Sequence, residues 1–254
     1  MQKFAYDDLI SRNYLYLNQE LQYEIRKTKL AFFGSGLSSN IALQATRLGF
    51  TNMYLHDGDK VELSNLNRQA FDCHDLGQYK VEALRKKILE INPLCNISVG
   101  AGFVGSINDV VEQIDDSDVV INTVDCTQIY FDIIEYARKN NKLVLCPFNP
   151  GFAGLVLCFS RESVSCWDVF DKQKPLDDFE ISQQLFLKYP EINAPAQAGG
   201  SIEEFLTNAR EHYFPQINIG ALLASSMVLT AMIKFLKKEP LKLAPEIFYV
   251  NIYG

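Results

Sequence analysis

A short apolar run followed by two closely spaced glycines limits the folds open to this chain more than any other feature. Residues 29–33, KLAFF, have the length and composition of a buried parallel strand. Gly34 and Gly36 follow in a turn, and residues 40–50 then repeat apolar side chains at helical spacing and end near a glycine. A second strand-like run, residues 51–57, completes a strand–turn–helix–strand unit of about 30 residues, which implies a parallel sheet.

The same alternation continues along the chain. Residues 80–92 have the pattern of an amphipathic helix, and the runs at 97–104 and 117–125 have that of strands. Strand-like runs at 155–160 and 248–253 come late and suit an antiparallel edge. We therefore predict an α/β, Rossmann-like fold with a mostly parallel sheet flanked by helices.

The alternation of strand-like and helix-like segments also indicates how the chain is divided. We expect an N-terminal helical arm over residues 1–27 and a Rossmann-like core over 28–160. Residues 161–254 then supply a long crossover and substrate segment, a late helix and a C-terminal strand of the same domain. Residues from about 170 to 214 do not continue the alternation of strands and helices and contain scattered Pro, Gly and Asp. Long connections of this kind are often functional.

Composition narrows the partners and the compartment. The net charge is −7, and no Lys or Arg run is long enough to follow a phosphate backbone, so we expect no nucleic-acid partner. The N-terminal residues hold no apolar segment of signal-peptide length. None of the six cysteines is spaced as C-x-x-C, which predicts reduced thiols, a cytoplasmic location and no zinc site.

One apolar segment approaches the length of a membrane span. Residues 214–235 carry few charges, but they include Gln216, Asn218, two serines and a threonine, and two lysines follow. We interpret this segment as a buried core helix, and we expect no membrane partner.

The glycine turn predicts an anion-binding site. In open parallel sheets, ligands bind beyond the carboxyl ends of the strands, where backbone N–H groups at a helix start face a phosphate. Ser39 occupies the place of the third glycine of a dinucleotide fingerprint and adds a hydroxyl. Asp57 ends the second strand, 21 residues after Gly36, close to the spacing of a ribose-binding carboxylate. An NAD(P)-dependent oxidoreductase and an ATP-using enzyme fit these residues equally well.

The stretch DGDKVELSNLNRQAFDCHDLGQYK, residues 57–80, favours ATP. It carries Asn65, Arg68, Gln69 and Lys80, and guanidinium and ammonium groups held in place stabilise charge on phosphoryl oxygens. Asp125 follows another strand at the same edge of the sheet, where a carboxylate is able to hold Mg²⁺ against phosphate oxygens. We therefore expect ATP and Mg²⁺ as cofactors.

These motifs, GSGLSSN, DGDKVELSNLNRQAF, LGQYK and NTVD, resemble the ThiF/MoeB/HesA superfamily of ubiquitin-activating-enzyme-like adenylyltransferases. The resemblance is strongest over about residues 10–160. It implies that ATP and a C-terminal carboxylate react to give an acyl-adenylate and pyrophosphate. The acceptor is usually a small ubiquitin-like or sulfur-carrier protein ending in Gly-Gly, or a peptide with a free C-terminus.

The resemblance also implies roles for particular residues. Arg12 matches an N-terminal arginine that commonly reaches across a homodimer into the partner's site. The remaining matches are Gly34 and Gly36 in the nucleotide turn, Asp57 on the ribose, Asn65, Arg68 and Lys80 on the phosphates, Gln69 at the end of the motif, and Asp125 as the magnesium aspartate.

Three departures from the family pattern bear on function. Leu37 and Ser39 stand where glycines are usual, and Tyr130 stands where arginine is frequent. The zinc-binding cysteine pairs are missing, and Cys166 is the sole candidate for a thioester-forming cysteine in the crossover region. A semi-buried, inert thiol is the simpler interpretation of Cys166.

Two other functions stay open at this point. An NAD(P)-dependent oxidoreductase would use the glycine turn and Asp57 but would leave Arg68, Lys80 and Asp125 without a purpose. A non-catalytic partner subunit of an activating enzyme would not need an intact charged set.

Overall fold

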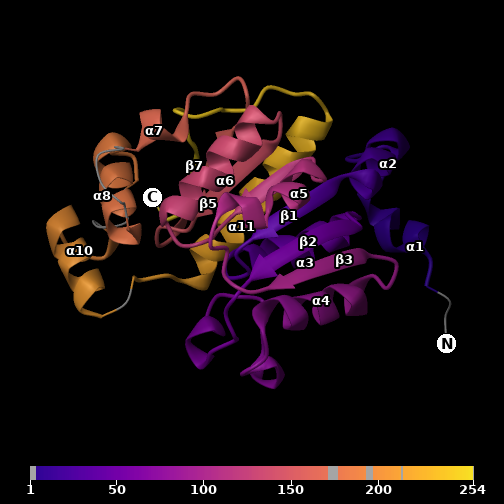
Figure 1. Ribbon diagram of the computed structural model, residues 1–254, viewed down its shortest axis with the longest axis horizontal. Coiled ribbons are helices and arrows are strands. Elements are labelled where there is room, and N and C mark those ends of the chain that lie inside the picture. Colours follow the sequence, from indigo (N-terminus) through magenta and orange to yellow (C-terminus); the bar gives the residue numbers. More distant parts are fainter. Residues whose placement is uncertain (1–3, 171–176, 193–196, 213, 254) are drawn as a thin grey trace.

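A seven-stranded sheet forms the centre of the molecule (Figure 1). The computed structural model describes residues 4–170, 177–192, 197–212 and 214–253. The order is β3-β2-β1-β4-β5-β6-β7; the first five strands in this order run parallel, β6 is antiparallel to β5, and β7 is antiparallel to β6. The predicted fold class, including the late antiparallel strands, is confirmed. The strands are β1 Lys29–Phe33, β2 Asn52–Asp57, β3 Asn96–Ala101, β4 Val119–Asn122, β5 Leu143–Phe148, β6 Ala153–Phe159 and β7 Phe248–Asn251.

Helices cover both faces of the sheet. On one face α2, α3, α4 and α11 pack, on the other α5, α6 and α7, while α8 and α10 form a lobe at one side (Figure 1). The helices are α1 Tyr6–Ile10, α2 Gln19–Lys27, α3 Ser38–Leu48, α4 Lys80–Ile91, α5 Val111–Asp115, α6 Gln128–Lys139, α7 Cys166–Val169, α8 Asp178–Lys188, α10 Ile202–Glu211 and α11 Asn218–Leu236, and the 3-10 turns are η1 Ser11–Asn13, η2 Leu63–Asn65, η3 Cys73–Asp75 and η4 Ile107–Asp109.

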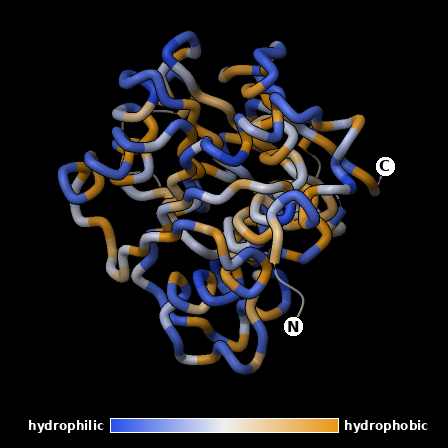
Figure 2. The backbone as a smooth tube through the Cα atoms, turned by 90° about the vertical axis from the view of Figure 1, so that its right-hand side faces the viewer, coloured by the Kyte–Doolittle hydropathy of each residue, from blue (hydrophilic) through white to orange (hydrophobic). Residues whose placement is uncertain are grey.

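Alternation along β1 divides the core into two layers. Leu30 and Phe32 face α3, α4 and α11, while Ala31 and Phe33 face α6, and all four side chains are buried. Figure 2 shows hydrophilic and hydrophobic residues alternating along the helices, as expected of helices with one face against the sheet. Because both faces are covered, the central strands β1, β4, β5 and β6 are almost wholly buried, whereas the edge strand β3 is partly exposed.

The N-terminal arm is not one helix. Leu15 has a positive φ of 74°, which ends the first helical stretch, and α2 begins afresh with the Asn18 side chain accepting from the Leu21 N–H at 2.9 Å. Ile25 of α2 is fully buried against the core. Residues 1–3 of the predicted arm, and 171–176, 193–196, 213 and 254 of the predicted crossover and C-terminal part, lie outside the described residues.

The late apolar segment packs against the sheet as predicted. Helix α11 has 19 residues and a mean hydropathy of 1.9, so by length and composition alone it is able to cross a membrane. Its buried side chains, including Ala224 and Val228, lie on the α3 side of the sheet. A Cβ on Gly220 would stand 2.4 Å from the carbonyl oxygen of Gly151, so this glycine allows the start of α11 to approach the loop before β6.

A buried carboxylate ties α6 to the start of the crossover segment. Glu135 forms an ion pair with Arg138 at 2.8 Å and accepts hydrogen bonds from the Ser165 hydroxyl at 2.7 Å and the Cys166 N–H at 2.8 Å. Burial raises the pKa of this carboxyl, but the hydrogen bonds from Arg138, Ser165 and Cys166 outweigh it and bring the pKa down to about 2.

We expect Glu135→Gln to lower the free energy of unfolding at pH 7 by about 2 kcal/mol, because the charged bonds are lost in a buried site. The pKa falls from 4.5 in the unfolded chain to about 2 on folding. The ionised form therefore stabilises the fold by about 3 kcal/mol at most above the unfolded pKa, and this contribution disappears as the pH falls from 4.5 towards 2. Urea denaturation at pH 7 and at pH 3.5 measures both effects.

The matched control is Glu90→Gln, whose side chain is 62% exposed in a surface pair with Lys86. We expect no measurable change for Glu90→Gln at either pH. A gap between Glu135→Gln and the native protein that is equally large at both values of pH contradicts the assigned pKa.

Candidate active site

The carboxyl ends of β1, β2, β4 and β5 border one cavity of about 610 Å³. Of the residues predicted to form the site, eight line it: Gly34, Gly36, Asp57, Asn65, Arg68, Gln69, Lys80 and Asp125. Ser39 and Arg12 do not line it. Parallel strands place their carboxyl ends at one edge of the sheet, which explains why residues so far apart in sequence meet here.

The glycine turn after β1 has no room for a side chain at its first glycine. Gly34 has a φ of 86°, and a Cβ on it would lie 2.5 Å from the carbonyl oxygen of Thr123, in the loop after β4. The Gly34 N–H donates to the carbonyl of His56 at 2.8 Å. Gly34 therefore lets the turn lie directly against the neighbouring strand ends, which keeps the mouth of the cavity open.

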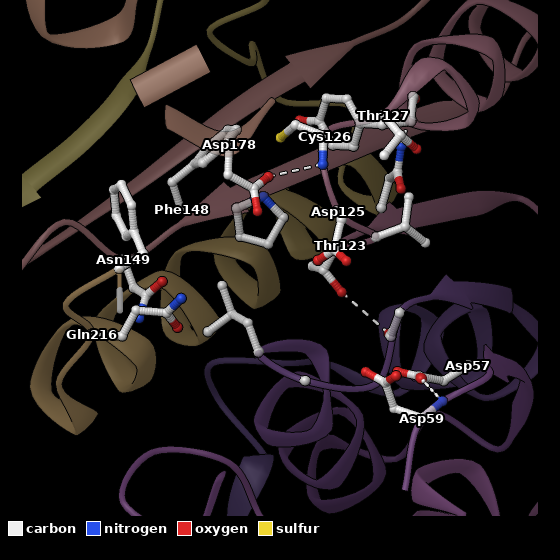
Figure 3. A pocket seen from close by; sticks show the side chains of 18 of the residues that line it. Asp57, Asp59, Thr123, Asp125, Cys126, Thr127, Phe148, Asn149, Asp178 and Gln216 are labelled. Carbon is white, nitrogen blue, oxygen red and sulfur yellow. Dashed lines mark hydrogen bonds between the residues drawn. The ribbon is translucent and has the colours of Figure 1, made fainter. Parts of the chain in front are cut away.

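Asp57 connects the turn to the end of β2. One carboxylate oxygen accepts from the Ser35 N–H at 2.5 Å and the other from the Asp59 N–H at 2.7 Å (Figure 3). Burial raises the pKa of Asp57, while Lys80 and the two backbone donors lower it. Asp57 thus fixes the shape of the glycine turn and also lines the cavity.

The Ser39 hydroxyl stabilises the glycine turn through two hydrogen bonds inside the protein. Ser39 is fully buried, its hydroxyl donates to the carbonyl of Gly36 at 2.7 Å, and the Ala70 N–H donates to it at 2.9 Å. Both bonds are internal, so Ser39 joins the start of α3 to the loop that follows Arg68. Arg12 is exposed on η1, outside the cavity.

Two cations enter the cavity from the stretch between β2 and α4. Lys80, the first residue of α4, has a side chain only 8% exposed and forms an ion pair with Asp59 at 2.8 Å. The Arg68 Nε donates to the Gln216 side chain at 2.7 Å, and burial lowers the Arg68 pKa. Arginine stays protonated under such shifts, so both side chains present positive charge to the cavity.

The other two predicted polar residues of this stretch lie beside them. The Asn65 side chain accepts from the Glu62 N–H at 3.0 Å in a capping box of η2. Gln69 approaches Gly36, and among the described residues its Oε1 is buried without a hydrogen-bond partner. A buried amide oxygen facing a cavity is suited to a donor on a ligand.

Asp125 lines the cavity and lies between Asp57 and Asp59 on one side and Asp178 on the other (Figure 3). Burial raises its pKa, and the negative charges of Asp178 and Asp59 raise it further, whereas Lys80 lowers it. Asp178, the first residue of α8, accepts from the Cys126 N–H at 2.9 Å. The Asp125 carboxylate, open to the cavity, is the type of oxygen ligand that a hard cation prefers.

The polar lining residues that the sequence did not point to include Asp59, Asn149, Asp178 and Gln216. Asp59 belongs to the motif itself, and its position two residues after Asp57 was an available signal. Asn149 follows β5, and Gln216 precedes α11; strand ends and a helix start were signals for both. Asp178 lies in a segment without periodicity, where no pattern marked it.

The cysteines offer no low-pKa thiol near the cavity. Cys126 lines it, but burial raises its pKa well above the usual value, as do Asp178 and the neighbouring thiol of Cys146. Cys166 is fully buried, and burial together with Glu135 raises its pKa strongly. In the described ranges, one group of three possible metal ligands occurs at Asp72, Cys73 and His74, which are all exposed and do not line the cavity.

The sheet order, the glycine turn after β1 and the polar cavity at the strand ends define a Rossmann-like α/β protein. The chain belongs to the ThiF family, whose model matches residues 10–254. The fold and the family agree with the resemblance carried by the sequence motifs.

Curated relatives match the chain over part of their length. A probable molybdopterin-synthase adenylyltransferase of Gracilaria tenuistipitata var. liui is 30% identical over 159 residues, which cover 61% of this chain and 44% of that protein. Ubiquitin-like modifier-activating enzyme 5 of Caenorhabditis elegans is 39% identical over 80 residues, 31% of this chain and 19% of the enzyme. The chain thus spans less than half the length of these relatives.

Solved structures share the fold over nearly the whole chain. The crystal structure of PaaA superposes with a TM-score of 0.70 at 19% identity and covers 99% of this chain and 81% of that one. The structure of E. coli MccB with AMPCPP and MccA gives a TM-score of 0.68 at 18% identity and covers 96% of this chain and 71% of that one. At such identities the similarity establishes the fold.

Proposed function

We propose that this protein is an ATP-dependent adenylyltransferase. It activates the C-terminal carboxylate of a small ubiquitin-like or sulfur-carrier protein, or of a peptide, as an acyl-adenylate and releases pyrophosphate. The observation that carries the proposal is the gathering of Arg68, Lys80 and Asp125 with the glycine turn in one cavity. The names of the relatives, an adenylyltransferase and a modifier-activating enzyme, support it, as does the solved complex of MccB with AMPCPP and MccA.

The reaction requires two anions to approach each other. A carboxylate oxygen of the acceptor bonds to the α-phosphorus of ATP, the bond from that phosphorus to the bridging oxygen breaks, and pyrophosphate leaves with the electron pair. Arg68 and Lys80 screen the phosphate charge, while the glycine turn and Asp57 hold the nucleotide. The protein supplies no side-chain nucleophile for this step, in agreement with the raised pKa values of Cys126 and Cys166.

A magnesium ion suits the Asp125 carboxylate, which lines the cavity and would hold the ion together with phosphate oxygens of the bound nucleotide. Bound there, Mg²⁺ would neutralise charge on phosphate oxygens. The described residues near the cavity include no thiol or imidazole cluster of the kind that zinc prefers.

The protein acts as a homodimer in the cytoplasm in this proposal. Arg12 is exposed on η1, beside the strongly exposed side chains of Tyr14, Leu15 and Tyr16. An apolar exposed run next to an arginine is suited to contact with a second copy. In such a dimer Arg12 would reach the partner's cavity.

The two alternative functions, an oxidoreductase and a non-catalytic partner subunit, leave the charged residues of the cavity unexplained. An oxidoreductase leaves the Lys80–Asp59 pair and Arg68 without a role in hydride transfer. A non-catalytic partner subunit does not need the cations and carboxylates that meet in the cavity.

ATP–pyrophosphate exchange tests the proposal. Purified protein, Mg-ATP and labelled pyrophosphate are combined with carrier proteins ending in Gly-Gly and with synthetic peptides. We expect exchange only when an acceptor is present, and its loss in Arg68→Ala, because the guanidinium screens the reacting phosphates. Preferential binding of NADH over ATP would favour the oxidoreductase, and absence of ATP binding would favour the partner subunit.

A further inference from the structure

The order of the strands determines the order in which the site residues follow one another along the edge of the sheet. Asp57 ends β2, Gly34 follows β1, and Asp125 follows β4, so in the proposed reaction the ribose and phosphates lie over these neighbouring strands. The next strand is β5, and the loop after it, residues 149–152, borders the same cavity. This inference rests on the proposed function: the acceptor's carboxylate has to reach the phosphates from the β5 side.

On that side the cavity has apolar walls. We name this part the terminal-residue chamber. Four of the five apolar residues that line it are at most 5% exposed, and two of these four belong to α8. The bond from the Cys126 N–H to Asp178 holds the start of α8 against the loop after β4. The chamber is lined by Phe148, Leu155, Leu185, Phe186 and Ile192.

Polar groups are few in the chamber, and they differ from those on the nucleotide side. The Asn149 side chain lies beside Gln216 at its edge (Figure 3). Among the described residues, the Asn149 Nδ2 is buried without a hydrogen-bond partner. An unpaired buried donor is costly unless a ligand supplies an acceptor, and a main-chain carbonyl of the acceptor would do so. The carboxylates of Asp125 and Asp178 line the entrance, and the Arg68 guanidinium, bonded to Gln216 at 2.7 Å, lies near its edge.

These features discriminate between acceptor tails. A Gly-Gly tail has no side chain to cover the chamber walls and would leave them in contact with water. An acidic side chain would lose its hydration between the buried apolar walls, and none of the chamber residues named above offers it a positive charge. We propose that the acceptor's C-terminal residue carries a large apolar side chain, of the leucine, methionine or phenylalanine class, that fills the terminal-residue chamber while Asn149 donates to a main-chain carbonyl.

Non-hydrolysable adenylate analogues test this without a known acceptor. The analogues are the N-acetylated glycyl, leucyl, lysyl and aspartyl sulfamoyl-adenosines, which share the nucleoside and differ only in the amino-acid side chain. Calorimetric titration gives the affinity of each, and differences in affinity report the contact between that side chain and the chamber. We expect the leucyl compound to bind at least about tenfold more tightly than the glycyl compound, because its side chain leaves water. We expect the aspartyl compound to bind most weakly.

A pair of variants on α8 supplies the control. Leu185→Trp fills the chamber, whereas Leu187→Trp changes a side chain that is 67% exposed on the same helix. We expect Leu185→Trp to bind the glycyl compound as before and to lose the preference for the leucyl compound, and Leu187→Trp to behave as the native protein.

The outcomes separate the two proposals. Equal affinity for the glycyl and leucyl compounds, or tighter binding of the lysyl compound, overturns the apolar terminal residue and leaves the adenylyltransferase standing. A preference that survives in Leu185→Trp also overturns it. Failure to bind any analogue, together with failure to bind ATP, overturns the proposed function as well.

Discussion

Replacing Asp125 with Asn is expected to reduce ATP–pyrophosphate exchange about a thousandfold. The side chain keeps its size, but the carboxylate that is placed to hold a cation becomes neutral. The native Asp125 is crowded by Asp178 and Asp59, whose charges raise its pKa after the effect of burial. Removing one negative charge relieves that repulsion, so we expect Asp125→Asn to be at least as stable as the native protein while it loses activity.

Exchange rates at several magnesium concentrations, together with urea denaturation, measure the two effects. The control is Asp116→Asn, since Asp116 is 73% exposed in a surface pair with Lys29. It should change neither rate nor stability. If Asp125→Asn exchanges at the native rate at low magnesium, the proposed metal position is wrong.

Gly34→Ala is expected to cost about 3 kcal/mol of stability and to weaken ATP binding about a hundredfold. The positive φ of 86° already strains any side chain, and the added Cβ would meet the Thr123 carbonyl oxygen at 2.5 Å. Either the turn or the loop after β4 has to move. Asp125 stands two residues further along that loop, so the displacement changes the cavity as well as the core.

Gly77→Ala separates the two causes. Gly77 has a similar φ of 80°, but a Cβ there would meet nothing within 4 Å. We expect it to lose about 1 kcal/mol through backbone strain alone and to bind ATP normally. Urea denaturation and calorimetric ATP titration of both variants give the comparison. Equal losses of stability in the two variants would show that contact with Thr123 contributes nothing.

The nucleotide side of the cavity was predictable from the sequence because its signals are local. A strand ends at a definable residue, and in a parallel sheet such ends meet at one edge, so the order of strands along the chain already brings Asp57 and Asp125 together. Arg68 and Lys80 belong to one specific motif between β2 and α4. Ser39 shows the limit of this reasoning: the sequence marks a hydroxyl beside the turn, and helix packing decides that it points inward to Gly36 and Ala70.

The β5 side was not predictable in the same way. Asp178 lies in a stretch rich in Asp, Lys and Pro, with no period that would distinguish the face of α8 towards the cavity from the outer face. Leu185 and Leu187 are neighbours of the same type, yet one is buried and the other is exposed. Which of them lines the chamber depends on how α8 lies against the loop after β4, where the bond from Cys126 to Asp178 joins segments far apart in the chain.

The layout of the sheet separates the two halves of the site along the chain. In the proposed reaction, residues up to Asp125 contact the nucleotide, and the walls facing the acceptor come from residues after β4, most of them from the segment between β5 and α11. Exchange of α8 and the loop after β5 between members of the family would therefore retarget the enzyme to a new acceptor without rebuilding its nucleotide chemistry. For protein engineering, this fold offers a constant activating half and a replaceable recognition half.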